Sequence, residues 1–269
     1  MFVSEKLAFI ELQKTGSSHV RQLLTQLVGG ELDGKHNLPS QKVLDSGVPI
    51  LGSVRNPWSW YVSLWTYGCQ KKGVLRQRLT DPARWVPKAG GDQKAKMATL
   101  PEGASAERAS SFWYADPSNP EAFREWLSLV LAPGARRIVE AGYGRSPIGK
   151  CGGLMTFRYF GLFVLNGTVP GPEYGTVEML NKLDKEKCLV KYFIKNENLE
   201  ADLLKTLAAC GVELTEEQTE SVVSARKTNV SARPLSTKEY FDEKSAQLVG
   251  EKERFIIEKF GYSNPFDRA

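Results

Sequence analysis

The residues of this chain that are best suited to chemistry lie in one short stretch near its start, Gln13-Lys-Thr-Gly-Ser-Ser18. Lys14 supplies a mobile positive charge, Gly16 allows the backbone to approach a ligand closely, and the two serines add hydroxyl donors. Where such a loop precedes a helix, unpaired backbone N–H groups and the helix dipole favour an anion at the same place. The stretch therefore predicts a loop that binds a phosphate or a chemically similar anion.

The spacing of this loop differs from that of the loop that binds nucleoside triphosphates. The triphosphate loop has the pattern G-x-x-x-x-G-K-[ST], in which the lysine follows two glycines. In this chain Lys14 precedes Gly16, the only glycine of the stretch. A P-loop-like kinase stays as an alternative, but it would need that glycine pattern and a metal-binding carboxylate at a strand end. Neither is evident in the sequence.

A second charged position follows in Arg55-Asn-Pro. Proline suits the first turn of a helix, so Arg55 is expected at a helix N-terminus, where a cation opposes the helix dipole. An anion is therefore expected as the partner of Arg55. Together with the loop at residues 13–18, this position predicts a ligand that carries two separate phosphates.

Three short apolar segments, 7–12, 49–54 and 188–194, have the length and composition of strands buried in a parallel sheet. Each is followed by apolar residues at helical spacing. We predict an α/β fold with a central, mostly parallel β-sheet flanked by helices, in which ligands bind at the carboxyl ends of the strands. Both charged stretches lie at such ends.

The rest of the chain is less regular. Residues 70–110 carry nine Lys or Arg against four Asp or Glu, which indicates either a basic lid or insertion or a solvated loop. Apolar spacing predicts a helix over 120–131, whereas residues 142–163 receive no assignment. Capping-box patterns at Thr215 and Ser236 predict a short helix and a long final helix that ends near Phe260.

Length and composition narrow the class of protein. A chain of 269 residues can bury one substantial core, so we expect a single domain over 1–269. A formal net charge of +5 is too low for a protein that wraps nucleic acid, and four widely spaced cysteines predict no metal site. We recognise neither a signal peptide nor a membrane-spanning run, and therefore expect a cytoplasmic protein. The oligomeric state is not predicted.

Residues 13–18 after a strand, followed by Val54-Arg-Asn-Pro-Trp-Ser-Trp-Tyr-Val-Ser63, resemble the signature of sulfotransferases that use 3′-phosphoadenosine 5′-phosphosulfate (PAPS). The Q-K-T-G form is most similar to the heparan sulfate 6-O-sulfotransferases and their smaller bacterial relatives. The resemblance implies a P-loop-like sulfotransferase fold. It also implies that the loop holds the 5′-phosphosulfate, while Arg55 and Ser63 hold the 3′-phosphate.

The same resemblance assigns further residues. Lys35-His36 is similar to the part of these enzymes that supplies a histidine base, and residues 226–231 are similar to a loop that closes over the nucleotide. Cytosolic relatives have an adenine-stacking tryptophan where His19 stands. The residues that the resemblance places at the PAPS site are Gln13, Lys14, Thr15, Gly16, Ser17, Ser18, Arg55, Ser63, Arg226, Lys227 and Asn229.

Sulfuryl transfer needs one group that stabilises the leaving oxygen and one that takes the acceptor proton. We expect Lys14 in the first role and His36, with an unperturbed pKa of about 6.5, in the second, with no metal required. The acceptor is a hydroxyl compound, and carbohydrate, lipid, phenol and small metabolite all stay open. A catalytically inactive nucleotide-binding module is a further alternative, which predicts that the nucleotide binds and no acceptor is sulfated.

Overall fold

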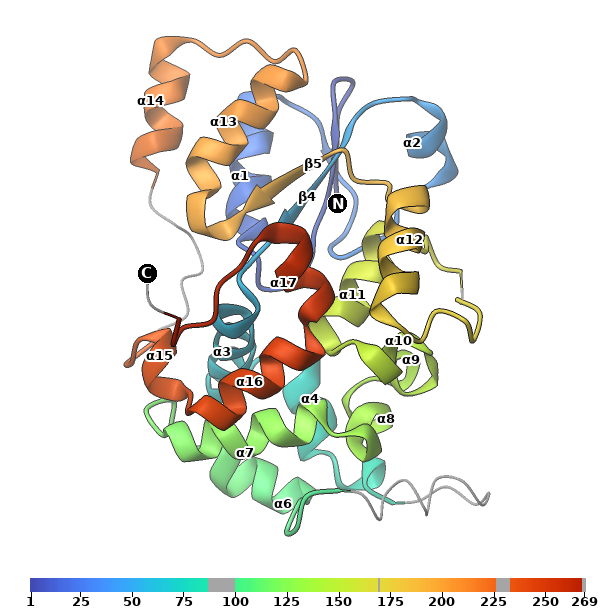
Figure 1. Ribbon diagram of the computed structural model, residues 1–269. Helices are drawn as coiled ribbons and strands as arrows, with labels where there is room; N and C mark the ends of the chain where they lie inside the picture. Colours follow the sequence, from blue (N-terminus) through green and yellow to red (C-terminus); the bar gives the residue numbers. More distant parts are fainter. Residues whose placement is uncertain (87–99, 169, 226–232, 268–269) are drawn as a thin grey trace. The chain divides into compact units, whose positions relative to one another are not determined.

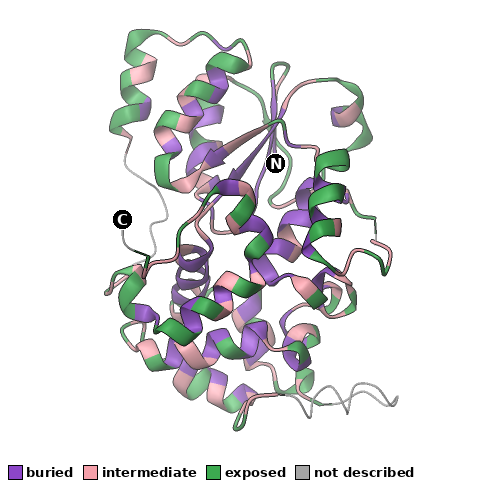
Figure 2. Ribbon diagram, in the orientation of Figure 1, coloured by how far each residue is buried: buried purple, intermediate pink, exposed green. Residues whose placement is uncertain are grey.

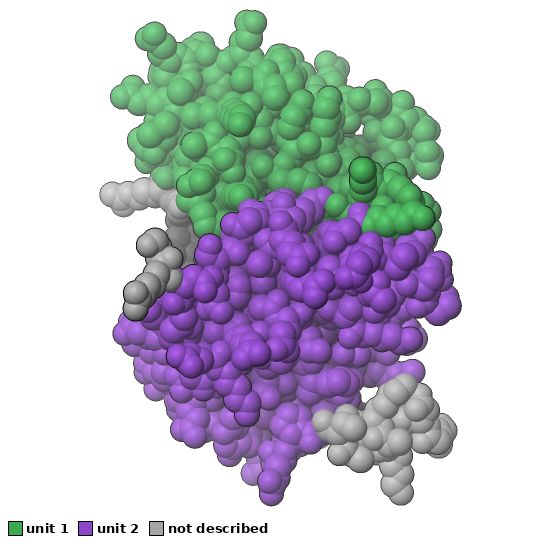
Figure 3. All heavy atoms as spheres, viewed as in Figure 1, with its two compact units in different colours: residues 1–56, 158–169, 182–230 green, residues 57–157, 170–181, 231–269 purple. Residues whose placement is uncertain are grey.

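The computed structural model describes residues 1–86, 100–168, 170–225 and 233–267 (Figure 1). The chain divides into two compact units, each assembled from three separate segments of the sequence (Figure 3). Unit 1 comprises residues 1–56, 158–169 and 182–230, and unit 2 comprises residues 57–157, 170–181 and 231–269. The sequence prediction of one domain over 1–269 stays a prediction.

Unit 1 contains a five-stranded sheet in the order β3-β1-β2-β4-β5. The strands are β1 (Phe2–Val3), β2 (Ala8–Ile10), β3 (Glu31–Leu32), β4 (Ile50–Val54) and β5 (Tyr192–Lys195). β2, β4 and β5 pair in parallel, whereas β1 pairs antiparallel with both β2 and β3. The α/β class is confirmed, but the sheet is mixed rather than mostly parallel.

The three predicted strands are the three that pair in parallel. Every residue of β2 and β4 is buried, which explains why both read as continuous apolar runs (Figure 2). The antiparallel strands β1 and β3 were not predicted, because two residues are too few to display a period. The wrong expectation about the sheet therefore comes from short strands at one edge.

Helices on the sheet of unit 1 complete its core. α1 (Ser17–Leu27) and α13 (Leu199–Ala209) contribute Leu23, Leu24, Leu203 and Leu207 to the same buried cluster as β2, β4 and β5 (Figure 1). The unit also contains α2 (Gln41–Asp45), η4 (Asn196–Asn198) and α14 (Glu216–Ser224). The predicted capping box of α14 is confirmed, because Thr215 and Gln218 bond reciprocally.

Unit 2 is helical in the residues that the structure describes. Its core is rich in aromatic side chains, and Trp58, Trp60 and Trp65 of α3 (Pro57–Cys69) are all buried. Its other elements before residue 152 are α4 (Val74–Thr80), η1 (Pro82–Arg84), α6 (Ala106–Arg108), η2 (Ala109–Trp113), α7 (Pro120–Leu131), η3 (Pro133–Ala135), α8 (Arg136–Val139), α9 (Ala141–Arg145) and α10 (Ile148–Cys151). The predicted helix over 120–131 is confirmed as α7. The segment 70–110, for which the sequence indicates a lid or insertion or a solvated loop, is partly helical, and its residues 87–99 lie outside the described residues.

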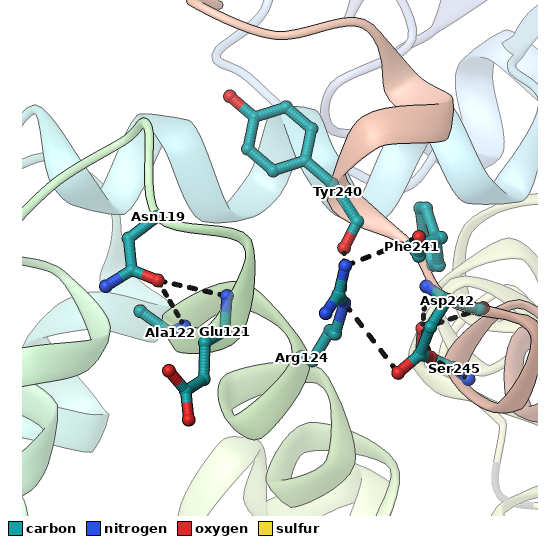
Figure 4. A network of polar contacts seen from close by, with 8 residues as sticks. All are labelled: Asn119, Glu121, Ala122, Arg124, Tyr240, Phe241, Asp242 and Ser245. Atoms are coloured by element: carbon teal, nitrogen blue, oxygen red, sulfur yellow. Dashed lines mark hydrogen bonds and ion pairs between the residues drawn. The ribbon is translucent and has the colours of Figure 1, made fainter.

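The predicted long final helix is wrong, because three helices occupy that part of the chain: α15 (Thr237–Tyr240), α16 (Glu243–Lys252) and α17 (Arg254–Phe260). Asp242 starts α16 by accepting a hydrogen bond from the backbone N–H of Ser245 (2.8 Å). Arg124 of α7 donates hydrogen bonds to the carbonyls of Tyr240 (3.1 Å) and Phe241 (3.5 Å) (Figure 4). In a continuous helix these carbonyls would accept from backbone N–H groups four residues later. These contacts separate α15 from α16.

A buried carboxyl group separates α16 from α17. Glu253 is fully buried and accepts four hydrogen bonds, from Tyr61 Oη (2.5 Å), Met155 N (3.0 Å), Thr156 N (2.8 Å) and Thr156 Oγ1 (2.6 Å). Both backbone donors belong to the first turn of α11 (Leu154–Phe163), a helix in the stretch that the sequence left unassigned. Burial raises the pKa of the Glu253 carboxyl, and its hydrogen bonds offset part of that shift.

α11 and α12 (Val177–Lys187) each contribute residues to both compact units. The buried residues of α11 include Leu154, Met155, Tyr159, Phe160 and Phe163. Its own apolar side chains lie on several faces of the helix, so no amphipathic period marks it in the sequence.

Among the described residues, no helix is both long and apolar enough to cross a membrane.

Candidate functional site

The N-terminus of α1 has the features of a candidate anion site. Gly16 is its N-cap residue and adopts a left-handed conformation (φ 80°), and no side chain caps the helix. The first turn contains no acidic residue. Among the residues that the structure describes, the backbone N–H groups of Gly16, Ser17 and Ser18 donate no hydrogen bond. These amides and the helix dipole favour a negative group in front of the helix.

Thr15 holds the loop to the sheet. Its hydroxyl donates to the Leu12 carbonyl (2.8 Å), lies 2.6 Å from Ser53 Oγ of β4, and is fully buried. Two protein partners therefore engage this hydroxyl, so Thr15, which the resemblance places at the PAPS site, fixes the loop against β2 and β4. Ser17 is buried, whereas Gln13 and Ser18 are half-buried.

The structure brings Arg55 to the loop. Arg55 follows β4 and Lys14 follows β2. Because these two strands are parallel neighbours, both residues lie at the carboxyl ends of the strands, on the same side of the sheet. Arg55 Nη1 donates to the backbone carbonyl of Lys14 at 3.2 Å. The two stretches that the sequence singled out for binding anions are thus in direct contact.

A third segment at the carboxyl ends of the strands was not identified from the sequence. Asn196 and Glu197 follow β5, which is the parallel neighbour of β4. A Cβ atom on residue 16 would lie 2.5 Å from Asn196 Nδ2, so the Asn196 amide packs directly on Gly16. Glu197 Oε1 accepts a hydrogen bond from the backbone N–H of Asn56 at 2.8 Å. The signal was present, because Asn196 and Glu197 follow a predicted parallel strand just as Gln13 and Arg55 do.

His36 lies close to the end of β2. Its Nδ1 is 2.7 Å from the backbone carbonyl of Glu11, so Nδ1 carries the proton in the neutral ring and Nε2 has the lone pair. Burial lowers the pKa of His36 from its ordinary value of 6.5, and the hydrogen bond to Glu11 opposes this shift. The positive charges of Arg158 and of the Met1 amino group also lower the pKa of His36.

Two predicted catalytic residues share an unusual backbone conformation. Lys14 (φ 64°) and His36 (φ 57°) are two of the four non-glycine residues with positive φ in the described part of the chain; the others are Lys71 and Asn166. A residue with a side chain pays about 1 to 2 kcal/mol for this left-handed conformation. Such strain tends to occur at functional sites, where the position of a side chain matters more than local stability.

The remaining predicted residues lie on α1, in unit 2 or outside the described part of the chain. His19 is buried on α1, and its Nε2 lies 3.8 Å from Glu200 Oε1 of α13. Its ring therefore does not offer an open face on which the adenine of a nucleotide could stack. Ser63 is buried within α3 and belongs to unit 2. Arg226, Lys227 and Asn229 lie outside the described residues.

Donors dominate the arrangement in unit 1. Backbone amides and the side chains of Lys14, Arg55 and Asn196 follow three neighbouring strands, and a Cβ at residue 16 would lie 2.5 Å from Asn196 Nδ2. This set suits a phosphate or sulfate group. In the described ranges, no group of three or more His, Cys, Asp or Glu side chains is placed to hold a metal ion. A scan against protein-family models, a search of curated proteins and a search of solved structures find no significant match to this chain.

Proposed function

We propose that this chain is a sulfotransferase, which transfers a sulfuryl group from PAPS to the hydroxyl group of an acceptor. The observation that carries the proposal is the contact between Arg55 Nη1 and the Lys14 carbonyl. It supports a single site for an anionic ligand at which both signature stretches act. A ligand with two separate phosphates, as the sequence predicts, would engage both.

The residues present fit the donor. The amides of Gly16, Ser17 and Ser18 and the Lys14 side chain would hold the 5′-phosphosulfate, and the Arg55 guanidinium would hold the 3′-phosphate, with Ser63 assigned by resemblance. PAPS supplies the activated sulfuryl group. Lys14, which has a left-handed backbone conformation in the loop, would stabilise negative charge on the leaving phosphate oxygen.

His36 would take the proton from the acceptor hydroxyl. Its Nδ1–H donates to the Glu11 carbonyl, which leaves Nε2 as the atom that accepts the proton. Because burial lowers the pKa of His36, the ring is neutral at neutral pH, as a base must be. The acceptor stays open between a carbohydrate, a lipid, a phenol and a small metabolite.

The alternatives make different predictions about binding and turnover. A P-loop-like kinase would bind ATP with a metal ion, and an inactive module would bind 3′-phosphoadenosine 5′-phosphate without sulfating any acceptor. Thermal shift with each nucleotide separates the kinase from the other two. A screen of hydroxyl acceptors with PAPS labelled at sulfur then separates the enzyme from the inactive module.

The Arg55→Ala variant tests the contact that carries the proposal. A charge-assisted hydrogen bond is worth about 1.5 to 3 kcal/mol, so the affinity for 3′-phosphoadenosine 5′-phosphate should fall at least about tenfold. Titration calorimetry measures this loss. Replacement of the exposed Lys42 of α2 by alanine removes the same charge and should leave the affinity unchanged. Equal stabilisation of the wild-type chain by ATP and by the 3′-phosphorylated nucleotide would contradict the proposal.

A further inference from the structure

The turn that follows β5 contacts both segments of the anion site in unit 1. Asn196 packs against Gly16, and Leu199 Cδ1 would lie 2.7 Å from a Cβ at residue 16. Next to Asn196, the Glu197 carboxylate accepts the backbone N–H of Asn56 at 2.8 Å. Neither the anion loop nor the signature around Arg55 includes Glu197.

The hydrogen bond to Glu197 acts on the peptide group that carries Arg55. The N–H of Asn56 belongs to the planar peptide unit that joins Arg55 to Asn56, so a partner for this N–H fixes the plane at the base of the Arg55 side chain. From the same residue, Arg55 Nη1 reaches the Lys14 carbonyl. Glu197, which follows β5, thus holds the backbone next to Arg55, and the Lys14 carbonyl, in the loop after β2, holds the Arg55 guanidinium.

The charge of Glu197 is opposite in effect to its hydrogen bond. Glu197 is exposed, and a carboxylate near a site for anions repels the ligand. Because the charge alone would weaken binding, the useful contribution of this residue is the hydrogen bond to Asn56. These two contributions can be separated, because glutamine keeps a carbonyl oxygen that accepts the N–H and removes the charge.

We propose that Glu197 is a positioning residue, which holds the Arg55–Asn56 peptide so that Arg55 meets the anionic ligand. The inference rests on the proposed function, since it concerns the affinity for the 3′-phosphorylated nucleotide. It predicts different effects for two substitutions at one position. Glu197→Ala loses the acceptor and weakens binding, whereas Glu197→Gln keeps the acceptor and binds as tightly as the wild type or slightly tighter.

Two measurements on the full chain test this proposal. Titration calorimetry with 3′-phosphoadenosine 5′-phosphate gives the dissociation constant, which should rise about fivefold in Glu197→Ala, the effect of losing one ordinary hydrogen bond. Amide hydrogen exchange followed by NMR should be faster at Asn56 in Glu197→Ala and unchanged in Glu197→Gln. Glu213→Ala is the matched control, because it removes an exposed glutamate of unit 1 and should change neither quantity.

The outcomes distinguish this inference from the proposed function. If the wild-type chain does not bind the nucleotide, the proposed function fails and the inference fails with it. If the wild type binds and Glu197→Ala binds equally well, only the inference is overturned. It is also overturned if alanine and glutamine tighten binding to the same extent, because the carboxylate then acts through its charge alone. Unchanged exchange at Asn56 in Glu197→Ala overturns it as well.

Discussion

The first turns of α1 and α11 solve the same problem in opposite ways. At α11, the backbone N–H groups of Met155 and Thr156 donate to Glu253, so the protein supplies the acidic partner from within unit 2. At α1, Gly16 caps the helix without a side chain, and no acidic residue lies in the first turn. This chain therefore satisfies the helix N-terminus of α11 from within, whereas the start of α1 has neither a side-chain cap nor an acidic residue in its first turn.

The two ends also differ in what surrounds them. Glu253 is fully buried among donors that leave no space for a ligand. The α1 end lies where β2, β4 and β5 finish, beside Arg55 and Asn196. Asn119 and Asp242 also cap their helices with side chains, as Figure 4 shows. The uncapped start of α1 therefore stands apart from α7, α11 and α16 and coincides with the gathering of cations.

The largest effect is expected at the N-terminus of α11, where Glu253 accepts the backbone hydrogen bonds. Glu253→Ala would leave the donors of Tyr61, Met155 and Thr156 without their acceptor inside the protein, so the free energy of unfolding should fall by about 4 kcal/mol. Urea unfolding measures the loss. Replacement of Glu251, an exposed residue at the end of α16, by alanine should cost less than about 0.5 kcal/mol. A loss below 1 kcal/mol for Glu253→Ala would remove the basis of the comparison.

A smaller loss is expected from Gly16→Ala. A side chain here must adopt φ 80°, and its Cβ would lie 2.5 Å from Asn196 Nδ2, so stability should fall by about 2 kcal/mol and the affinity for the nucleotide should also fall. Gly211→Ala is the control, because Gly211 has φ 70° with no atom within 4 Å of the added Cβ. Equal losses in the two variants would show that the close packing of Asn196 on Gly16 has no energetic effect.

His36 provides a pH test of the ligand end. Because burial lowers its folded pKa below the unfolded 6.5, the unfolded chain binds more protons between these two values. The contribution of His36 to stability is thus present above pH 6.5 and is lost as the pH falls through the folded pKa. NMR titration of the imidazole should give a midpoint below 6.5, and the acidic limb of the pH–rate profile should follow it. A midpoint above 6.5, assigned by comparison with His36→Asn, would contradict this.

The smallest effect concerns backbone strain. Lys14→Gly relieves the left-handed conformation, and the greater freedom of glycine in the unfolded chain offsets part of the gain, so stability should rise by about 0.5 kcal/mol. Lys71→Gly relieves the same strain (φ 60°) at an exposed position of unit 2 and should give a similar gain. Only Lys14→Gly should weaken binding of the nucleotide. Equal binding in both variants would argue against a role for Lys14.

The sequence predicted those parts of the fold in which one pattern dominates. β2, β4 and β5 are short, buried and apolar, and both charged stretches follow such strands, so their meeting at one sheet edge was predictable. β1 and β3 were missed because a two-residue strand is defined by its partners and not by its own composition. α11 was missed because apolar residues surround it, which removes the amphipathic signal.

Part of the site could not be predicted from the sequence. The acceptors of the Asn56 N–H and of His36 Nδ1 are separated from their partners by long stretches of chain, and no local pattern indicates them. The division of the last helix has the same origin, because Arg124 of α7 takes the carbonyls of Tyr240 and Phe241. Local spacing could locate the charged residues, whereas only the folded chain reveals what holds them.

The discontinuous units have a consequence for how this protein is made. β2 and β4 leave the ribosome before residues 57–157, which belong to unit 2, and β5 follows only afterwards. Pairing across such a separation adds an entropic cost that grows only slowly with loop length, but it slows folding. Neither unit can be obtained by cutting the gene at one position, so expression of fragments, split reporters and terminal deletions should yield chains that lack part of a sheet or a core.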